Sequence, residues 1–175
     1  MKHARLNREK WINAALTALR SDGPPALRAE PLARRLGTTK GSFYWHFADV
    51  PAFHDALLDH WKSRAFADVV ALLEGQGNAA TRLQDFGAHV LDDTTAPAIR
   101  SWAQEHKGAA DALAQVDAER LTYMATLLLQ LGLKNPDFAR AAYGALIGMP
   151  MLPKSKRHDS ANAYTALIDL VLALR

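Results

Sequence analysis

The sequence predicts an all-α protein of nine helices, in which a small basic head precedes a longer helical body. Apolar residues recur every three or four positions along almost the whole chain, whereas the period-two alternation of strands is nearly absent. Gly, Pro and Asn residues separate the helical segments. We therefore expect a head over residues 1–48 and a body over residues 49–175.

Local signals place three helices in the head. Asn7 can cap the first helix, and the run Gly23-Pro24-Pro25 ends it. Gly37 suits the left-handed residue that ends the second helix, and Thr39 can cap the third. Two helices joined by a short turn with Gly are typical of a helix-turn-helix, so the head is predicted to contain this motif. The expected helices cover residues 8–22, 29–36 and 40–47.

The same signals place six helices in the body. Asp49 can cap a long helix that holds Pro51 in its first turn, where the missing N–H of proline is tolerated. Segments rich in Gly, Pro, Asn and Asp separate the helices that follow. The expected helices cover residues 50–73, 79–92, 98–106, 109–131, 137–149 and 161–174.

The composition excludes several classes of protein. The chain has 175 residues and is 49% apolar, which is enough for a sizeable core. It has no Cys, so disulfides, thiolate zinc sites and Cys nucleophiles are excluded. No apolar run reaches the roughly 20 residues of a membrane span, and the charged start MKHARLNREK has no apolar segment of a signal peptide. We expect a cytoplasmic protein that spans no membrane.

The charge is divided unevenly between head and body. Residues 1–47 hold nine Lys and Arg against three Asp and Glu, a balance of +6, whereas the remaining residues have a balance of −3. A basic head on a mildly acidic body favours a polyanionic partner such as double-stranded DNA. The alternative is that the basic head only increases solubility.

The stretch KGSFYWHF, residues 40–47, divides into two faces on a helix. Phe43 and Phe47 are four positions apart and share the face that we expect to join the core of the head. We expect Leu32, Leu36 and Ile12 to complete this core. The other face carries Lys40, Ser42, Tyr44 and His46.

The polar face has the groups that a helix in the major groove needs. Lys40 can reach a phosphate or a guanine edge, and Ser42 can reach either. Tyr44 and His46 can donate to phosphate oxygens, which fixes register. Trp45 has two open alternatives, contact with a sugar or a thymine methyl, or inward packing against the fourth helix. The alternative for the whole stretch is a core helix with a solvated edge.

The segment LARRLGTTKGSFYWHF, residues 32–47, resembles the recognition segment of the TetR family of bacterial transcriptional repressors. The resemblance extends over residues 5 to about 60 and is weaker in the body, in IRSWAQEH, VDAERLTYMATLL and AYGALIG. It implies an all-helical homodimer with a three-helix DNA-binding head and a ligand-binding body. It also implies that ligand binding moves the fourth helices apart, so that the heads lose register on a palindromic operator.

The same resemblance implies a set of DNA-contacting residues. By position these are Arg28, Lys40, Gly41, Ser42, Tyr44, Trp45 and His46, while Thr39 caps the recognition helix and touches a phosphate. Two positions depart from the family pattern. Val50 stands near the place where many members carry a phosphate-binding Lys, and Arg28 stands where Ser or Thr usually caps the second helix. Arg28 can supply a phosphate contact but cannot accept the capping hydrogen bonds.

The body carries candidates for a ligand pocket. A pocket needs apolar walls and a few converging polar groups. The candidates are Trp61, Phe86, His89, Trp102, His106, Tyr123, Met124 and Tyr143. The alternative for each of them is ordinary core packing. His89 and His106 with Asp93 or Glu105 match no standard metal-ligand spacing, so we expect no metal and no cofactor.

The last two helices carry apolar stripes that we expect to pair across a two-fold axis in a homodimer. The stripes contain Ala139, Ala142, Tyr143 and Leu146 in one helix and Ala163, Leu167, Leu170, Val171 and Leu174 in the other. The alternative is that both stripes close the core of a single chain.

These observations lead to one function and two alternatives. We expect a DNA-binding transcriptional regulator, a repressor that a largely apolar small molecule releases from a palindromic operator. The alternatives are a DNA-binding protein of the same fold that a protein partner controls, and an all-helical module that binds no DNA. No nucleophile elbow, phosphate-binding loop, dinucleotide glycine pattern or HExxH motif is present, so we do not expect an enzyme.

Overall fold

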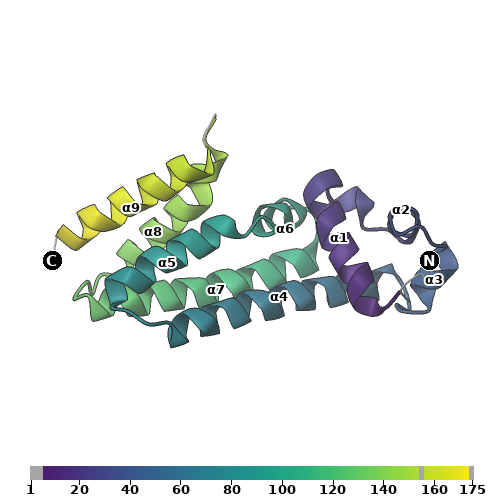
Figure 1. Cartoon of the computed structure of the whole chain (residues 1–175), viewed down its shortest axis with the longest axis horizontal. Helices are drawn as coiled ribbons and strands as arrows, with labels where there is room; N and C mark the ends of the chain where they lie inside the picture. Colours follow the sequence, from purple (N-terminus) through teal and green to yellow (C-terminus); the bar gives the residue numbers. More distant parts are fainter. Residues whose placement is uncertain (1–5, 154–155, 174–175) are drawn as a thin grey trace. The chain divides into compact units, whose positions relative to one another are not determined.

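The computed structural model describes residues 6–153 and 156–173, and this part of the chain is helical without a strand. Nine α-helices and two short 3₁₀ helices make up its secondary structure, which confirms the predicted fold class (Figure 1). The α-helices are α1 (Arg8–Asp22), α2 (Ala29–Arg35), α3 (Lys40–Tyr44), α4 (Val50–Glu74), α5 (Ala79–Asp92), α6 (Ala96–Trp102), α7 (Lys107–Gln130), α8 (Asp137–Gly148) and α9 (Arg157–Ala173). The 3₁₀ helices are η1 (Pro24–Ala26) and η2 (Met149–Met151).

Three helix boundaries differ from the prediction by three or four residues. α3 ends at Tyr44 rather than at residue 47, with Trp45 as its C-cap. α6 ends at Trp102 rather than at residue 106, because the imidazole of His106 caps the next helix. Its Nδ1 accepts a hydrogen bond from the N–H of Ala109 at 3.1 Å. α9 begins at Arg157, four residues earlier than expected, where a carboxylate oxygen of Asp159 accepts the N–H of Lys156 at 2.9 Å.

The chain forms two compact units. The first contains the residues up to Arg64 together with Thr94–Gln115, and the second contains Ala65–Asp93 together with the residues from Val116 onward. The long helices α4 and α7 therefore contribute residues to both units. These units do not coincide with the expected division after residue 48, and that division stays a prediction about function.

A cluster of aromatic rings holds the three helices of the head together. The ring of Phe43 lies 5.4 Å from that of Trp11, edge-on, and 5.1 Å from those of Phe47 and Phe53. Leu32 and Ile12 are buried as predicted, whereas Leu36 is only half-buried. The sequence did not single out Trp11, which is fully buried at the centre of this core.

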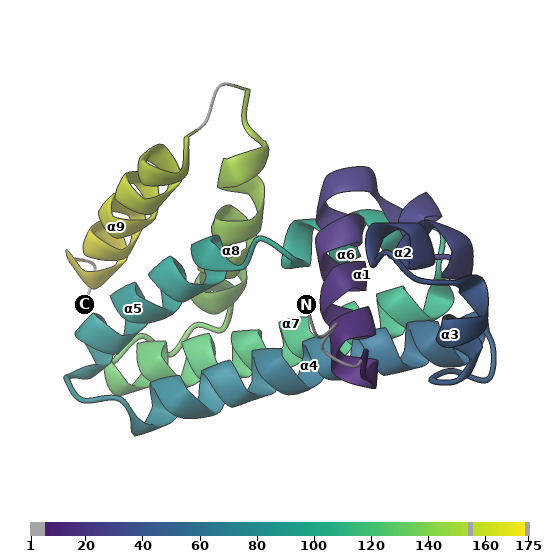
Figure 2. The same cartoon turned by 45° about the vertical axis from the view of Figure 1, so that its right-hand side comes forward.

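In the second unit, α9 packs against α5 and α8 (Figures 1 and 2). The ring of Tyr164 in α9 lies directly against Gly87 of α5, and its hydroxyl donates to the carbonyl oxygen of Leu83 at 3.1 Å. An ion pair between Arg157 and Asp92 joins the same two helices. In the described part of the chain, no helix is long and apolar enough to cross a membrane.

Candidate nucleic-acid interface

The candidate site is built on α3 and the turn before it. Gly37 adopts φ 63°, a left-handed conformation that glycine accepts easily, and this ends α2. The side chain of Thr39 then accepts the N–H of Ser42 at 3.3 Å, so the predicted cap of α3 is present. A cap at one end and the buried ring of Phe43 at the other fix this five-residue helix on the head.

The aromatic residues around α3 divide between the core and the solvent. Trp45 is 89% exposed, so it does not pack inward against α4, one of its two predicted alternatives. Tyr44 is 46% exposed, and the ammonium group of Lys40 lies 6.0 Å from the centre of its ring. His46 is half-buried, with its ring 6.4 Å from those of Trp11 and Phe47. The exposed rings therefore stand at the outer side of α3, whereas the imidazole lies at the edge of the core.

The remaining predicted residues also lie at the surface of the head. Arg28, Thr39, Lys40 and Gly41 are exposed, and Ser42 is half-buried. Arg28 stands at the N-cap of α2 without a capping side-chain hydrogen bond, as its chemistry requires. Its guanidinium is thus not engaged in holding the helix start.

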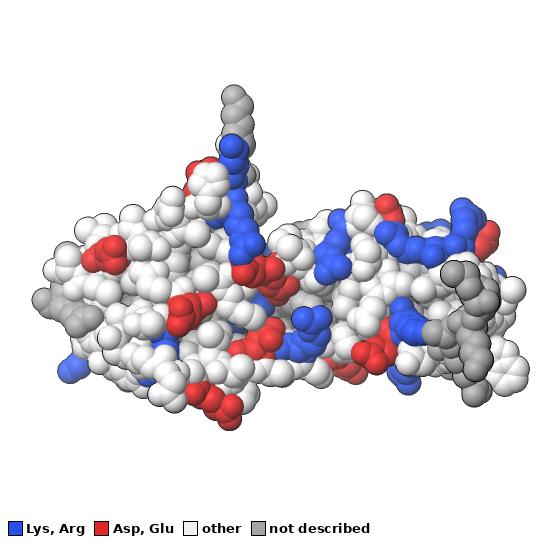
Figure 3. All heavy atoms as spheres, viewed as in Figure 1, with Lys and Arg blue, Asp and Glu red and all other residues white. Residues whose placement is uncertain are grey.

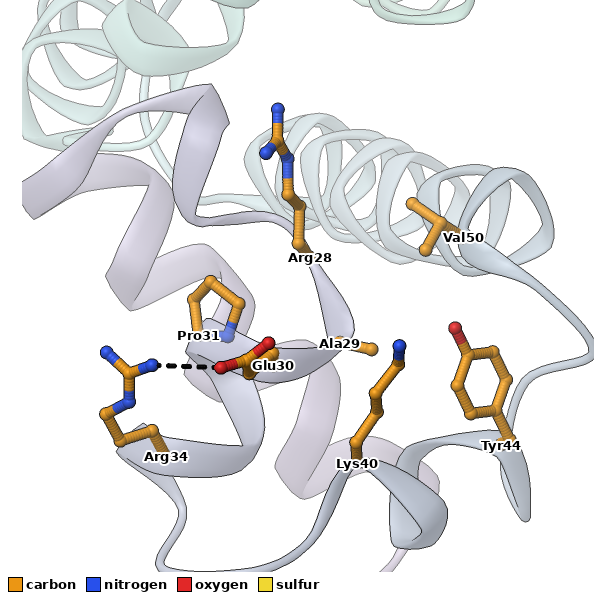
Figure 4. Close-up of a pocket in the computed structure, with 8 residues that line it drawn as sticks. All are labelled: Arg28, Ala29, Glu30, Pro31, Arg34, Lys40, Tyr44 and Val50. Atoms are coloured by element: carbon orange, nitrogen blue, oxygen red, sulfur yellow. Dashed lines mark hydrogen bonds and ion pairs between the residues drawn. The ribbon is translucent and has the colours of Figure 1, made fainter.

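A surface hollow of about 550 Å³ joins the start of α2, α3 and the start of α4 (Figure 4). Arg28, Lys40 and Arg34 bring three cationic groups to it, and Tyr44 brings a hydroxyl. The other lining residues are Ala29, Glu30, Pro31 and Val50. Figure 3 shows a run of Lys and Arg side chains over α2 with acidic side chains beside it. The hollow is therefore a cationic surface whose edge is formed by the helix-turn-helix.

Sequence reasoning did not assign a site role to Glu30 or Arg34. These two side chains form an ion pair at 3.2 Å, one turn apart on α2. The basic pair in LARRLG indicated a positive surface, but the sequence alone does not show that Arg34 lines one hollow with residues of α3. In contrast, Arg35 pairs with Asp22 of α1 at 2.6 Å.

Three comparisons with known proteins agree on the origin of this head. A family model described as bacterial regulatory proteins, tetR family, matches residues 12–49. An HTH-type transcriptional regulator of Mycobacterium tuberculosis is 28% identical over 171 residues, which cover 98% of this chain and 68% of that protein. The class D tetracycline repressor protein of Escherichia coli is 44% identical over 54 residues, 31% of this chain and 25% of that repressor. The head of this chain therefore matches the TetR family over residues 12–49.

The fold of most of the chain is also found in a solved structure. A transcriptional regulator from Saccharomonospora viridis, solved in complex with choline, superposes with a TM-score of 0.79. The superposition covers 93% of this chain and 95% of that one at 14% identity. The solved structure shows the fold, and the family model matches the helix-turn-helix in the head.

The candidate pocket residues fall into two groups. Phe86, Tyr123, Met124 and Tyr143 are buried together in the core of the second unit. His89 belongs to the same unit and is half-buried, with Nε2 3.3 Å from a carboxylate oxygen of Asp68. The structure thus brings four of the candidates into one apolar cluster.

The other group lies in the first unit. Trp61 and Trp102 are buried there, and His106 stacks on Trp102 with ring centres 4.5 Å apart. The ring of His54 meets both, at 5.0 Å from Trp102 and 5.3 Å from His106. Nε2 of His54 lies 3.0 Å from the carbonyl oxygen of Leu27. Burial is the main cause that lowers the pKa of His54 below its ordinary value, against the raising effect of the Leu27 carbonyl.

The second unit also encloses a polar network that sequence reasoning did not find. The guanidinium of Arg120 is 2% exposed and donates to a carboxylate oxygen of Asp93 at 2.9 Å. Tyr143 donates its hydroxyl to Asp117 at 2.7 Å. Burial, followed by the charge of Asp117, raises the pKa of Tyr143 to about 12. Among the described residues, no group of three or more His, Asp or Glu is placed to hold a metal ion.

The predicted dimer stripe of α8 needs a correction. Ala139, Ala142, Tyr143 and Leu146 are buried within the single chain, because this side of α8 packs into the core of the second unit. These side chains are therefore not free to meet a partner.

The stripe of α9 is divided between core and surface. Val171 is buried within the chain, Leu167 is half-buried, and Ala163 and Leu170 are exposed. Leu174 lies outside the described residues.

Proposed function

We propose that this protein is a sequence-specific repressor of the TetR family, and that a small molecule bound by the body releases it from a palindromic operator. One observation supports the proposal most. The helix α3 has a side-chain cap and follows the turn at Gly37, and its exposed Lys40 and Tyr44 line one hollow together with Arg28 and Arg34. A helix held in this way can enter the major groove while the cations contact phosphates on either side.

Each predicted DNA-contacting residue receives a role in this proposal. Lys40 and Ser42, in the first turn of α3, contact base edges. Arg28 and Tyr44 bind phosphate oxygens, and Thr39 both caps α3 and approaches a phosphate. Trp45 lies along a sugar or a thymine methyl, because its ring is exposed. Gly41 allows close approach of the backbone, and His46 contacts a phosphate from the edge of the core.

A homodimer supplies the two heads that a palindrome requires. The exposed side of α9 carries Ala163 and Leu170, and the exposed side of α8 carries Ala141 and Gly144. Small and apolar residues on neighbouring helices are suited to close packing with a second copy. The dimer surface of this proposal is thus the outer face of α8 and α9 rather than the buried stripe of α8.

The effector in this proposal is a small, largely apolar molecule that binds residues of the body, 49–175. The apolar cluster around Phe86 and Met124 supports it, as does a structurally similar regulator that was solved with choline. The head, residues 1–48, holds the DNA contacts. We expect no metal or other cofactor in either part.

Selection from a pool of random duplexes tests the proposal. Purified protein is mixed with the pool at low and at moderate salt, and the retained duplexes are sequenced. We expect a palindromic motif whose half-sites lie about one helical turn or more apart, with weaker retention at the higher salt. If no motif is retained at either salt concentration, both the palindromic operator and the repressor function are contradicted.

A further inference from the structure

The hollow beside α3 contains one group whose chemistry differs from the rest. Arg28, Arg34 and Lys40 offer only hydrogen-bond donors, and the hydroxyl of Tyr44 can both donate and accept. Glu30 is the one acidic residue among the lining residues, and an ionised carboxylate only accepts. Figure 4 shows this carboxylate between the guanidinium of Arg34 and the ammonium group of Lys40.

The stability of α2 does not account for a glutamate at this place. The side chains of Glu30 and Arg34 are 72% and 78% exposed, and an exposed pair of this kind contributes about 0–1 kcal/mol. An acidic residue in the first turn also favours a helix, but an aspartate serves that purpose equally well. The longer side chain instead carries its carboxylate out into the hollow.

The charges around Glu30 determine which part of a duplex it can meet. A phosphate would repel the carboxylate, whereas it attracts the flanking groups of Arg28, Arg34 and Lys40. With Arg28 and Arg34 on phosphates and Lys40 on a base edge, Glu30 is directed toward the base edges in the groove between the strands. At the base edges, the carboxylate of Glu30 needs a base that presents a hydrogen-bond donor with no acceptor beside it.

Only one base fits this requirement in the major groove. Guanine presents two acceptors there, thymine an acceptor and a methyl group, and adenine an acceptor beside its amino group. Cytosine presents its amino group alone, and carboxylates accept hydrogen bonds from it. We propose that Glu30 selects a cytosine in each half-site of the operator. This inference rests on the proposed DNA-binding function and adds a base contact from α2 to those from α3.

Random-duplex selection with position-30 variants of the full chain tests the inference. Glu30→Gln exchanges the carboxylate for an amide, which pairs with the amino group and ring nitrogen of adenine. Glu30→Asp keeps the charge at the start of α2 but withdraws the carboxylate from the hollow. Glu9→Gln is the matched control, because Glu9 is the exposed first-turn acid of α1 and does not line the hollow.

We expect the wild-type motif to contain one cytosine per half-site that depends on Glu30. Glu30→Gln should change this preference to adenine, and Glu30→Asp should reduce it by about tenfold, the ratio that corresponds to about 1.4 kcal/mol. Glu30→Gln should also bind unrelated DNA somewhat more tightly, because it removes the one negative charge from a hollow lined by three cations. Glu9→Gln should leave the motif unchanged.

The outcomes separate the inference from the function on which it rests. A wild-type motif that all three variants retain unchanged overturns the role of Glu30 and leaves the DNA-binding function intact. A wild-type protein that selects no motif removes the proposed function itself. Thermal unfolding of Glu30→Asp and Glu30→Gln identifies a folding defect, and the gain in nonspecific affinity expected of Glu30→Gln would not occur in an unfolded head.

Discussion

At the scale of single residues, Gly87 allows the ring of Tyr164 to lie directly on α5. A Cβ atom placed at position 87 would come 2.0 Å from a ring carbon of Tyr164, which is far inside contact distance. Glycine in a helix usually costs about 0.5–1 kcal/mol relative to alanine. This cost is offset here by the buried ring and its hydrogen bond to Leu83.

Gly87→Ala should therefore lower the free energy of unfolding by about 1–3 kcal/mol, because the ring has to move out of a packed core. Denaturant unfolding monitored by circular dichroism measures the change. Gly148→Ala is the control, since a Cβ at position 148, in the last turn of α8, meets nothing within 4 Å. It should be neutral or stabilise α8 by up to about 1 kcal/mol. Equal effects of the two substitutions would contradict the packing described for α5 and α9.

His54 gives the first unit a dependence on pH. Its pKa in the folded protein is lowered, mainly by burial, so the unfolded chain takes up the proton more readily in the interval between the two values. The free energy of unfolding should therefore fall as the pH drops below about 6.5, the ordinary pKa of histidine. His106 lowers the pKa further, whereas the Leu27 carbonyl and Asp55 raise it.

His54→Gln should flatten this part of the pH profile, because a neutral amide can keep the contact with Leu27 without titrating. Melting temperatures between pH 5 and 8 test it. His158→Gln, at an exposed imidazole, is the matched substitution for comparison. A slope that survives in His54→Gln would assign the effect to other groups.

At the scale of elements, α3 is too short to be stable on its own. Helices of fewer than about 12 residues are marginal in water, and α3 has five. Its hydrogen-bonded turns are held by the Thr39 cap and by the buried ring of Phe43. The orientation of the groups that we propose to contact DNA therefore depends on one hydroxyl and one ring.

Thr39→Ala should cost about 0.5–2 kcal/mol of stability and should weaken operator binding as well, because α3 loses its cap. Asn7→Ala removes the matching cap of α1, whose Asn7 accepts the N–H of Lys10 at 2.9 Å. We expect a similar loss of stability there but a smaller loss of DNA affinity. Fluorescence anisotropy with a labelled operator compares the two. Equal losses of affinity would mean that the cap of α3 has no special part in reading DNA.

Helix starts and ends were predictable where the signal is local. The caps at Asn7 and Thr39 and the turn at Gly37 depend on neighbouring residues, and the structure contains all three. The predicted end of α6 was wrong, because the sequence does not indicate that the side chain of His106 caps the next helix. The hollow at α2 and α3 was not predictable, since it depends on which way Glu30 and Arg34 point from α2.

The same limit applies to the apolar stripes. An apolar stripe shows that one side of a helix is covered, but it does not show whether the cover is the same chain or another. The stripe of α8 is buried by the chain's own core around Leu146. The stripe of α9 is only partly buried by the same chain, because Val171 is buried and Leu170 is exposed.

At the scale of the whole molecule, repression from a palindrome requires two heads held at a fixed spacing. A charge introduced among the exposed apolar side chains of α9 should weaken the proposed dimer more than a charge elsewhere. Leu170 is 61% exposed on this helix, and Leu129 is 59% exposed on α7 in the same unit.

Leu170→Glu should convert the dimer to a monomer and reduce operator affinity by more than about a hundredfold, because a monomer holds one half-site only. Leu129→Glu adds the same charge at an equally exposed leucine and should leave the dimer intact. Sedimentation equilibrium and anisotropy measure the two properties. A dimer that survives Leu170→Glu would place the interface elsewhere.

The most direct measurement compares affinity for the selected operator and for a shuffled duplex over a series of salt concentrations. We predict a preference of at least about a thousandfold for the operator, and a linear fall of the logarithm of the association constant with the logarithm of salt concentration. Equal affinity for both duplexes, or affinity that does not change with salt, would contradict a basic head that reads DNA through α3.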